Sequence, residues 1–165
     1  MSDSLPWEYR DALGYDGLPV DEDRAIRLLQ TIDIHATNRL GETPLSVAAM
    51  LGRTKTITWL LENGAEVDYV VSTSNCPTPL LCACDQKRLH AAEVLLDHGA
   101  DIEAVDRFNH TPLATTFINC FSNPLPLAEM LISRGAILTE RAKELGSAWD
   151  SEQFKRFLER INSSE

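Results

Sequence analysis

The chain has 165 residues and carries 25 acidic against 15 basic side chains, which gives a net charge of -10. This length is enough for one domain of ordinary size or a short array of repeats. The charge opposes binding to nucleic acid, because affinity for a phosphate backbone depends largely on lysine and arginine. The same charge favours a basic protein as the partner. The longest apolar runs are five residues, far below the ~20 that a membrane helix needs, so we expect no membrane association.

The amino terminus and the cysteines indicate a reducing compartment. The first residues lack the basic start and the apolar stretch of a secretory signal, which predicts a cytoplasmic protein. Without export, a chain of this length does not need disulfide bonds, so reduced thiols are expected. Cys82 and Cys84 fall at small apolar positions of an expected helix, which favours a core role over metal binding. The other two cysteines are Cys76 and Cys120.

In chain order, the first 37 residues predict one helix pair. Residues 6–13 form a possible first helix, and residues 24–29 form an apolar second helix. The run Asp21-Glu22-Asp23 precedes the second helix, where the positive end of the helix dipole favours negative charge. This segment is interpreted as an N-terminal unit.

A triplet that recurs three times organises the middle of the chain. Thr-Pro-Leu occurs at residues 43–45, 78–80 and 111–113, and Gly-Ala follows 21, 21 and 24 residues after each threonine. Threonine caps a helix through its hydroxyl, and proline at the first helical position lacks the N–H that would have no partner there. Each triplet therefore predicts the start of a helix, and internal repetition at this period is typical of a repeat array.

Each repeat predicts two antiparallel helices. In the first repeat a short helix runs from Pro44 to Leu51 and Gly52 ends it. A second helix places Ile57, Leu60 and Leu61 on one face, and Gly64 supplies its C-terminal cap. Residues 140–148 and 151–161 predict a last helix pair without the triplet.

The stretch Gly41-Glu-Thr-Pro-Leu-Ser-Val-Ala-Ala-Met-Leu-Gly52, continuing to Leu60-Leu-Glu-Asn-Gly-Ala-Glu-Val67, resembles the ankyrin repeat family. The resemblance implies an all-α ankyrin-repeat solenoid of about five helix-pair units, with atypical units at both ends. The units are an N-terminal cap at 1–37, repeats at 38–70, 71–104 and 105–138, and a C-terminal cap at 139–165. Repeat two has two extra residues within 69–77, and repeat three has three extra within 120–126.

The sequence contains no constellation of residues that predicts catalysis. Its four histidines are scattered over different units and lack the spacing of zinc ligands, so a solvated or capping role is expected for His35, His90, His98 and His110. Phosphate-binding glycine loops and nucleophile motifs are missing. We therefore expect no enzyme activity, no cofactor and no metal.

The family resemblance implies that the turns between repeats and the exposed side of the first helices bind another protein. Carried over position by position, this face consists of Arg39, Leu40, Glu42, Met50, Leu51, Ser74, Asn75, Pro77, Asp85, Gln86, Arg107, Phe108, His110, Ile118 and Asn119. An alternative is that Leu51 and Ile118 complete the core between repeats, since single apolar residues near the surface are common.

These observations predict a protein that acts only by binding and that is monomeric when free. Inhibition of the partner is the first hypothesis, and the specific form is an immunity protein that neutralises a cognate, possibly basic, toxin. The rival hypothesis is a scaffold or adaptor that joins two partner proteins. A scaffold would need two separate footprints, whereas an inhibitor needs one.

Overall fold

The computed structural model describes residues 7–14, 20–38, 40–70, 77–118 and 123–163. Across these residues it contains ten helices and no strand, which confirms the all-α prediction. The helices are α1 (Trp7–Ala12), α2 (Glu22–Leu29), α3 (Pro44–Leu51), α4 (Thr54–Glu62), α5 (Pro79–Asp85), α6 (Leu89–Asp97), α7 (Pro112–Thr116), α8 (Leu125–Ser133), α9 (Glu140–Trp149) and α10 (Ser151–Asn162).

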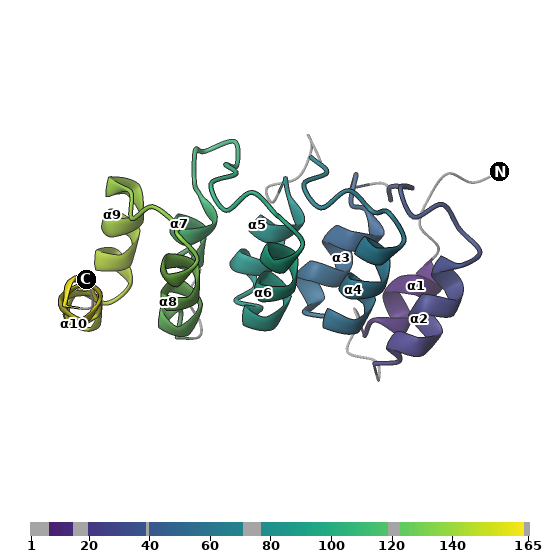
Figure 1. Ribbon diagram of the computed structural model, residues 1–165, viewed down its shortest axis with the longest axis horizontal. Helices are drawn as coiled ribbons and strands as arrows, with labels where there is room; N and C mark the ends of the chain where they lie inside the picture. The colour runs from purple at the N-terminus through teal and green to yellow at the C-terminus, as the bar shows by residue number, and fades with distance from the viewer. Residues whose placement is uncertain (1–6, 15–19, 39, 71–76, 119–122, 164–165) are drawn as a thin grey trace.

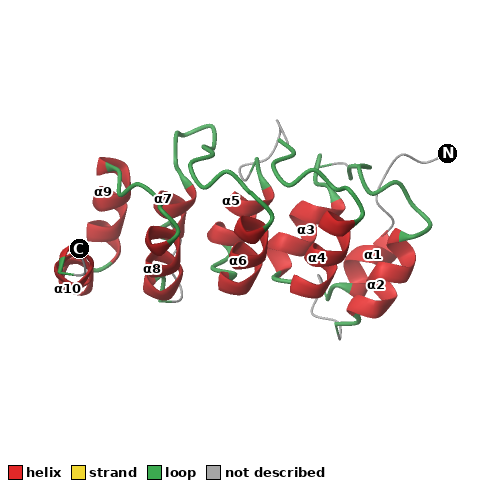
Figure 2. Cartoon of the chain, viewed as in Figure 1, coloured by secondary structure: helices red, strands yellow, loops and turns green. Residues whose placement is uncertain are grey.

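The helices from α1 to α8 stack as successive antiparallel pairs along one axis, and α9 and α10 follow at the end of the stack (Figure 1). Helix α3 packs on α5, α5 on α7 and α7 on α9, while α4 lies between α2 and α6, and α6 contacts α8. The result is two layers of helices, and the loops that join one pair to the next follow a single edge, uppermost in Figure 2. Helix α10 is viewed nearly along its axis in Figure 1, so it departs from the direction of the other helices.

Threonine side chains start the first helix of each repeat, as the sequence predicts. The hydroxyls of Thr43, Thr78 and Thr111 accept hydrogen bonds from the backbone N–H three residues later, and proline follows each of them. Thr139 caps α9 in the same way without a following proline. Gly52 ends α3 in the left-handed region, with φ of 73°, where a residue without Cβ carries no steric penalty.

The N-terminal pair is joined to the first repeat by a buried tyrosine. Tyr9 on α1 is fully buried, and its hydroxyl donates to the carbonyl of Pro44 at 2.9 Å. Burial raises the pKa of Tyr9 well above its usual value, and the nearby charge of Glu22 adds to this effect. Helix α2 begins at Glu22 with Asp21 as its cap, two residues before the predicted start at Arg24, because the acidic run forms the first turn of the helix.

Arginine side chains connect each central unit to the unit before it. The Nε of Arg53 donates to the Leu13 carbonyl at 2.8 Å, and the Nε of Arg88, which is 35 positions later, donates to the Met50 carbonyl at 3.1 Å. Both bonds satisfy a carbonyl at or just beyond the end of the preceding unit's first helix. The bond to the third repeat has the opposite direction along the chain, because Lys87 of the second repeat donates to the Ile118 carbonyl of the third at 2.6 Å.

Aromatic packing joins the C-terminal pair to the third repeat. Phe117 stands where the first repeat has Ala49, and its ring lies 5.2 Å from Phe154 and 6.4 Å from Phe157, both on α10. Gly146 on α9 makes room for this cluster, since a Cβ there would lie 2.2 Å from the Phe154 ring. The predicted last helix pair is confirmed, and the departure of the third repeat from the Ala pair is matched by its neighbour.

Small and aliphatic side chains make up most of the core between the layers. Aromatic side chains complete it at the two ends, namely Tyr9, Phe117, Phe154 and Phe157. Cys82 and Cys84 are buried there as free thiols, which confirms their predicted core role, whereas Cys76 and Cys120 lie outside the described residues. Among the helices of the described segments, none combines the length and apolarity needed to cross a membrane.

Candidate protein-binding edge

The loops between the units bring exposed apolar side chains to one side of the molecule. We name this side the turn edge, made of residues 30–38, 40–42, 63–70, 77, 98–110 and 134–138. Six large apolar side chains are exposed in the described part of the chain, and one of them, Val20, lies off this edge. The five on the turn edge are Leu40, Val70, Val105, Phe108 and Ile137. Apolar side chains concentrated on one edge indicate an interaction surface, whereas scattered ones do not.

The loop of the third repeat is fixed by one carboxylate. Oδ1 of Asp106 accepts hydrogen bonds from the backbone N–H groups of Phe108 and His110, both at 2.8 Å. Asn109 has φ of 62°, a left-handed conformation that asparagine tolerates better than most residues. These contacts hold the backbone of the tip in one conformation.

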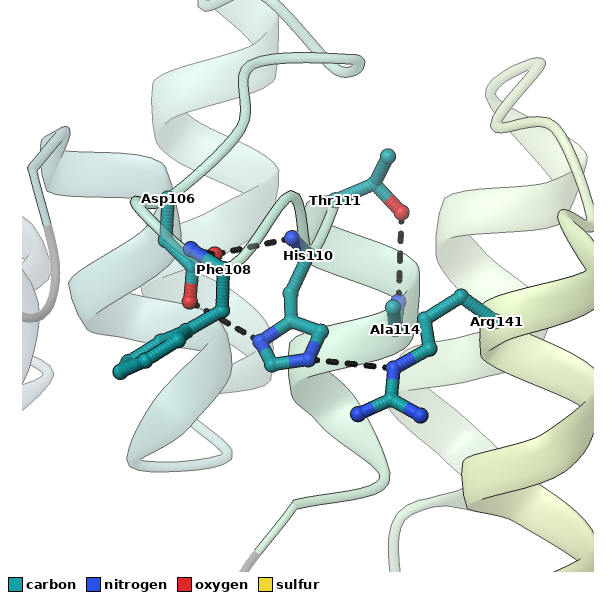
Figure 3. Close-up of polar contacts among 6 residues, drawn as sticks. All are labelled: Asp106, Phe108, His110, Thr111, Ala114 and Arg141. Carbon is teal, nitrogen blue, oxygen red and sulfur yellow. Dashed lines mark hydrogen bonds and ion pairs between the residues drawn. The ribbon is translucent and has the colours of Figure 1, made fainter.

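An aromatic ring projects from this tip (Figure 3), and the guanidinium of Arg107 lies over it. The side chain of Phe108 is 59% exposed, the guanidinium carbon of Arg107 lies 4.7 Å from the ring centroid, and the His110 ring lies 5.8 Å away. Aromatic residues and arginine are the commonest sources of binding energy in protein interfaces. The tip therefore presents a preformed anchor to a partner.

His110 supports the tip from inside and does not itself face solvent. Its Nδ1 lies 3.0 Å from Oδ2 of Asp106, and its Nε2 accepts from Nε of Arg141 at 3.3 Å (Figure 3). The residue is buried, so of the two expected roles, solvated or capping, the structure contradicts the solvated one for His110. Its physical role is to join the tip of the third repeat to α9.

The loop of the first repeat has the same design with other side chains. Oδ1 of Asn38 accepts from the N–H groups of Leu40 and Glu42, and its amide donates to the Glu42 carboxylate at 2.6 Å. Gly41 has φ of 77° at the position that Asn109 occupies in the third repeat. Leu40 is exposed at the tip, so both large apolar side chains that the sequence places on tips do project.

The remaining predicted residues divide by burial. Met50 and Leu51 are half-buried and pack against the core, as the core alternative for Leu51 expects, and Pro77 is buried. Gln86 is exposed and donates to the half-buried Asp85. Ile118 is also half-buried. Four predicted residues, Arg39, Ser74, Asn75 and Asn119, lie outside the described residues.

Sequence reasoning missed the residues that fix the tips, Asn38 and Asp106. A signal for them exists, because an Asn or Asp stands five residues before Thr43 and before Thr111, and short polar side chains of this kind cap their own loops. A third missed feature is a cavity of ≈ 410 Å³ beside α8 and α10, lined by Leu125, Gln153, Arg156, Phe157 and Arg160.

The histidines and the other metal-ligating side chains stay apart or in pairs in the residues that the structure describes. No three His, Cys, Asp or Glu side chains there come together as metal ligands. His90 pairs with Glu93, and His98 contacts the Val94 carbonyl on its own helix. Both histidines are exposed, as expected for solvated or capping residues.

Stacked helix pairs with projecting loops define a class of repeat protein whose units each contact only their neighbours. Within that class, a family model described as ankyrin repeats, in three copies, matches residues 21–106. The chain belongs to the ankyrin repeat family. Ankyrin repeats are generally protein-protein interaction modules and are generally not catalytic.

Three similar proteins carry names of different kinds. Ankyrin repeat and SOCS box protein 16 of Mus musculus is 39% identical over 102 residues, which is 57% of this chain and 21% of that protein. The mouse B-cell lymphoma 3 protein homolog is 35% identical over 74 residues, 45% of this chain and 16% of its own length. A putative ankyrin repeat protein of Fowlpox virus, FPV024, is 29% identical over 130 residues, 75% and 21% respectively. The chain thus spans about a fifth of the length of these relatives.

Proposed function

We propose that this chain binds another protein through the turn edge and inhibits it. The observation that carries the proposal is that, among the described residues, five of the six exposed large apolar side chains lie on that edge. Two of them, Leu40 and Phe108, stand on tips whose backbones are held by Asn38 and Asp106. A rigid tip loses little conformational entropy on binding, so its contacts contribute more to affinity.

The charge of the chain supports a basic partner. With a net charge of -10, long-range attraction raises the rate of encounter with a positive surface. Neutralisation of a basic toxin, as an immunity protein performs it, is the specific form of inhibition that we propose on this ground. Association should then slow markedly between low and high salt, since exposed charges are screened over ~8 Å at physiological ionic strength.

A scaffold function is the second candidate, and the cavity beside α8 and α10 favours it. Leu125, which lines the cavity, begins α8, whereas the C-terminal end of α8 leads into the turn edge. A second partner seated there would leave the turn edge free. If two proteins bind the chain at the same time, the result supports the scaffold. If the chain binds a single protein and blocks the activity of that protein, the result supports inhibition.

The test of the proposal begins with capture of the partner from a native extract on the immobilised chain. Phe108→Ala, Arg107→Ala and Leu40→Ala are then compared with the parent chain by titration calorimetry. At least one should weaken binding by ~1 kcal/mol or more, because hot spots are a few aromatic, apolar and arginine anchors.

The matched control is Val20→Ala, since Val20 is exposed but lies off the turn edge. It should leave affinity unchanged, and the melting temperature of all four variants should stay near that of the parent. Unchanged affinity in all three edge variants would contradict the proposal and move the site elsewhere.

A further inference from the structure

Three loops of the turn edge repeat one and the same turn, and an acidic residue opens each of them. Asp33, Glu66 and Asp101 are all exposed and are 33 and 35 positions apart. The carbonyl of each accepts from the N–H three residues later. The three bonds are Ala36 N to Asp33 O at 3.0 Å, Tyr69 N to Glu66 O at 3.3 Å and Ala104 N to Asp101 O at 3.2 Å.

The preceding backbone is also equivalent in the two central loops. Ala65 N donates to the Leu60 carbonyl at 2.9 Å, and Ala100 N donates to the Leu95 carbonyl at 3.1 Å. Each alanine stands directly before the acidic residue. The carboxylates of Glu66 and Asp101 therefore leave their units from corresponding places.

These carboxylates are not neutralised by cations of the described chain. Eight carboxylates of the described residues lie against a Lys, Arg or His side chain, and none of them belongs to Asp33, Glu66 or Asp101. Asp33 and Asp101 each use Oδ1 to accept the N–H two residues later, at 2.9 Å in both loops. Such a local bond orients the side chain and leaves its charge uncompensated.

Apolar side chains accompany the acids. Four residues after Glu66 and after Asp101 stand Val70 and Val105, which are 62% and 47% exposed. At the next unit Ile137, 62% exposed, takes the place of the acidic residue directly after the Gly-Ala pair. The turn edge thus alternates negative and apolar groups along the stack and ends on an apolar group.

The spacing of the units selects the conformation of a bound chain. Packed helices lie ~8–10 Å apart, so equivalent residues of neighbouring units are separated by about 10 Å. A polyproline II segment has three residues per turn and rises ~3.1 Å per residue, which returns a side chain to the same face every ~9.3 Å. A β-strand returns one every ~6.6 Å or ~13 Å, and neither value matches.

An α-helix could also match, because two residues seven apart lie ~10.5 Å from one another on the same face. Contact with three carboxylates would then require 15 ordered residues, and isolated helices of that length are marginal in water. The polyproline II form needs seven residues and is already populated in unfolded chains. The extended form therefore reaches the three acids at a lower entropic cost.

We propose that the turn edge receives an extended segment of its partner in which a lysine or arginine recurs at every third residue, with apolar residues between. The three cations face Asp33, Glu66 and Asp101, and the apolar residues contact Val70 and Val105. This inference rests on the proposed function, and it specifies which chemistry of the partner the edge recognises.

The test uses synthetic peptides with the full chain. The probe is acetyl-Lys-Val-Pro-Lys-Val-Pro-Lys-amide, which places a cation at every third residue and favours polyproline II. The reference is acetyl-Lys-Lys-Lys-Val-Pro-Val-Pro-amide, with the same composition and charge. Titration of the ¹⁵N-labelled chain should show the spaced probe binding about fivefold or more tightly than the reference, with shifts confined to the turn edge.

Charge-neutral variants separate register from general attraction. Asp33→Asn, Glu66→Gln and Asp101→Asn combined should abolish the preference for the spaced probe, and asparagine preserves the local Oδ1 bond. The control combines Glu62→Gln, Glu152→Gln and Glu159→Gln, which removes the same charge from exposed helix positions and should preserve the preference.

Several outcomes would overturn the inference. They are equal affinity for the two peptides, shifts away from the turn edge, or tighter binding of a helical peptide with lysines seven residues apart. With the native partner, a loss of affinity in Phe108→Ala alone, without any loss in the triple acid variant, would reject the register and leave the proposed function standing. No loss in the triple acid variant or in any of Phe108→Ala, Arg107→Ala and Leu40→Ala would reject both.

Discussion

The central repeats and the C-terminal end solve the same packing problem with different side chains. Helix α3 contacts α5 and carries the fully buried Ala48 and Ala49, and the Met50 carbonyl accepts from Arg88 of the next unit. Between the third repeat and the last pair, Phe117 fills the space and meets Phe154 and Phe157. Small residues bring helices close together, whereas aromatic residues hold them by area.

The comparison indicates that a repeat can depart from the sequence of the other repeats at a position where only one neighbouring unit has to change with it. Each unit of a stacked array contacts only the units beside it, so a large residue at the last repeat needs compensation in the terminal pair alone. Gly146 supplies that compensation by leaving room for the Phe154 ring. A change of the same kind in the middle of the stack would meet unadapted neighbours on both sides.

The largest expected effect comes from removal of the aromatic link. Phe117→Ala leaves a cavity beside Phe154 and Phe157, and truncation of a buried phenylalanine costs about 3–5 kcal/mol. Urea unfolding followed by circular dichroism measures it. The matched control is Phe108→Ala, because that ring is 59% exposed and its loss should change the free energy of unfolding little. Equal effects of the two variants would show that the cluster does not hold the end.

The converse substitution asks whether the centre tolerates what the end accepts. Ala49→Phe places at the first repeat the residue that the third repeat carries, at a site with no exposed surface. Overpacking of a filled core costs about 1–3 kcal/mol, so the urea midpoint should fall. Glu62→Phe, at an exposed position, is the control for the added ring. A variant as stable as the parent would remove the distinction between the two regions.

The smallest expected effect tests the compensating glycine. Gly146→Ala should gain ~1 kcal/mol in helix propensity, but its Cβ meets the buried Phe154 ring, and such overpacking costs about 1–3 kcal/mol. The net change should therefore be a loss of about 1 kcal/mol in the free energy of unfolding. In a chain that already carries Phe154→Leu, the addition of Gly146→Ala should raise the free energy of unfolding. The control Ser147→Ala, at an exposed site of α9, should not destabilise the chain. Stabilisation by Gly146→Ala alone would contradict the assigned contact.

Much of the fold could be predicted because its signals are local. Threonine followed by proline starts a helix through bonds within four residues, and α3 has the predicted bounds, Pro44–Leu51. The start of α2 lies two residues before the predicted one, because Glu22 and Asp23, which the sequence predicts to precede the helix, form its first turn. The direction of α10 and its contact with Phe117 could not be predicted, since they depend on residues about 40 positions apart.

The candidate site was predictable at its tips and not beneath them. Exposure of Leu40 and Phe108 follows from their place between turn residues, and the structure agrees. The family resemblance places His110 on the binding face, yet its neighbours Asp106 and Arg141 enclose it. Arg141 lies 31 positions away, and no periodic pattern relates the two residues. The repeat pattern therefore identifies which loops project, but not which side chains within a loop turn inward.

The hydroxyl that joins α1 to the first repeat also makes that junction sensitive to alkali. Burial raises the pKa of Tyr9 well above its ordinary value, and the charge of Glu22 raises the pKa further by a smaller amount. The phenol therefore stays protonated in the folded chain at a pH at which it would already ionise in an unfolded one. The unfolded state therefore binds fewer protons above pH ~10, and stability falls as the pH rises through that range. Phenolate absorbance that appears late for one tyrosine would mark the moment at which the first unit separates from the stack.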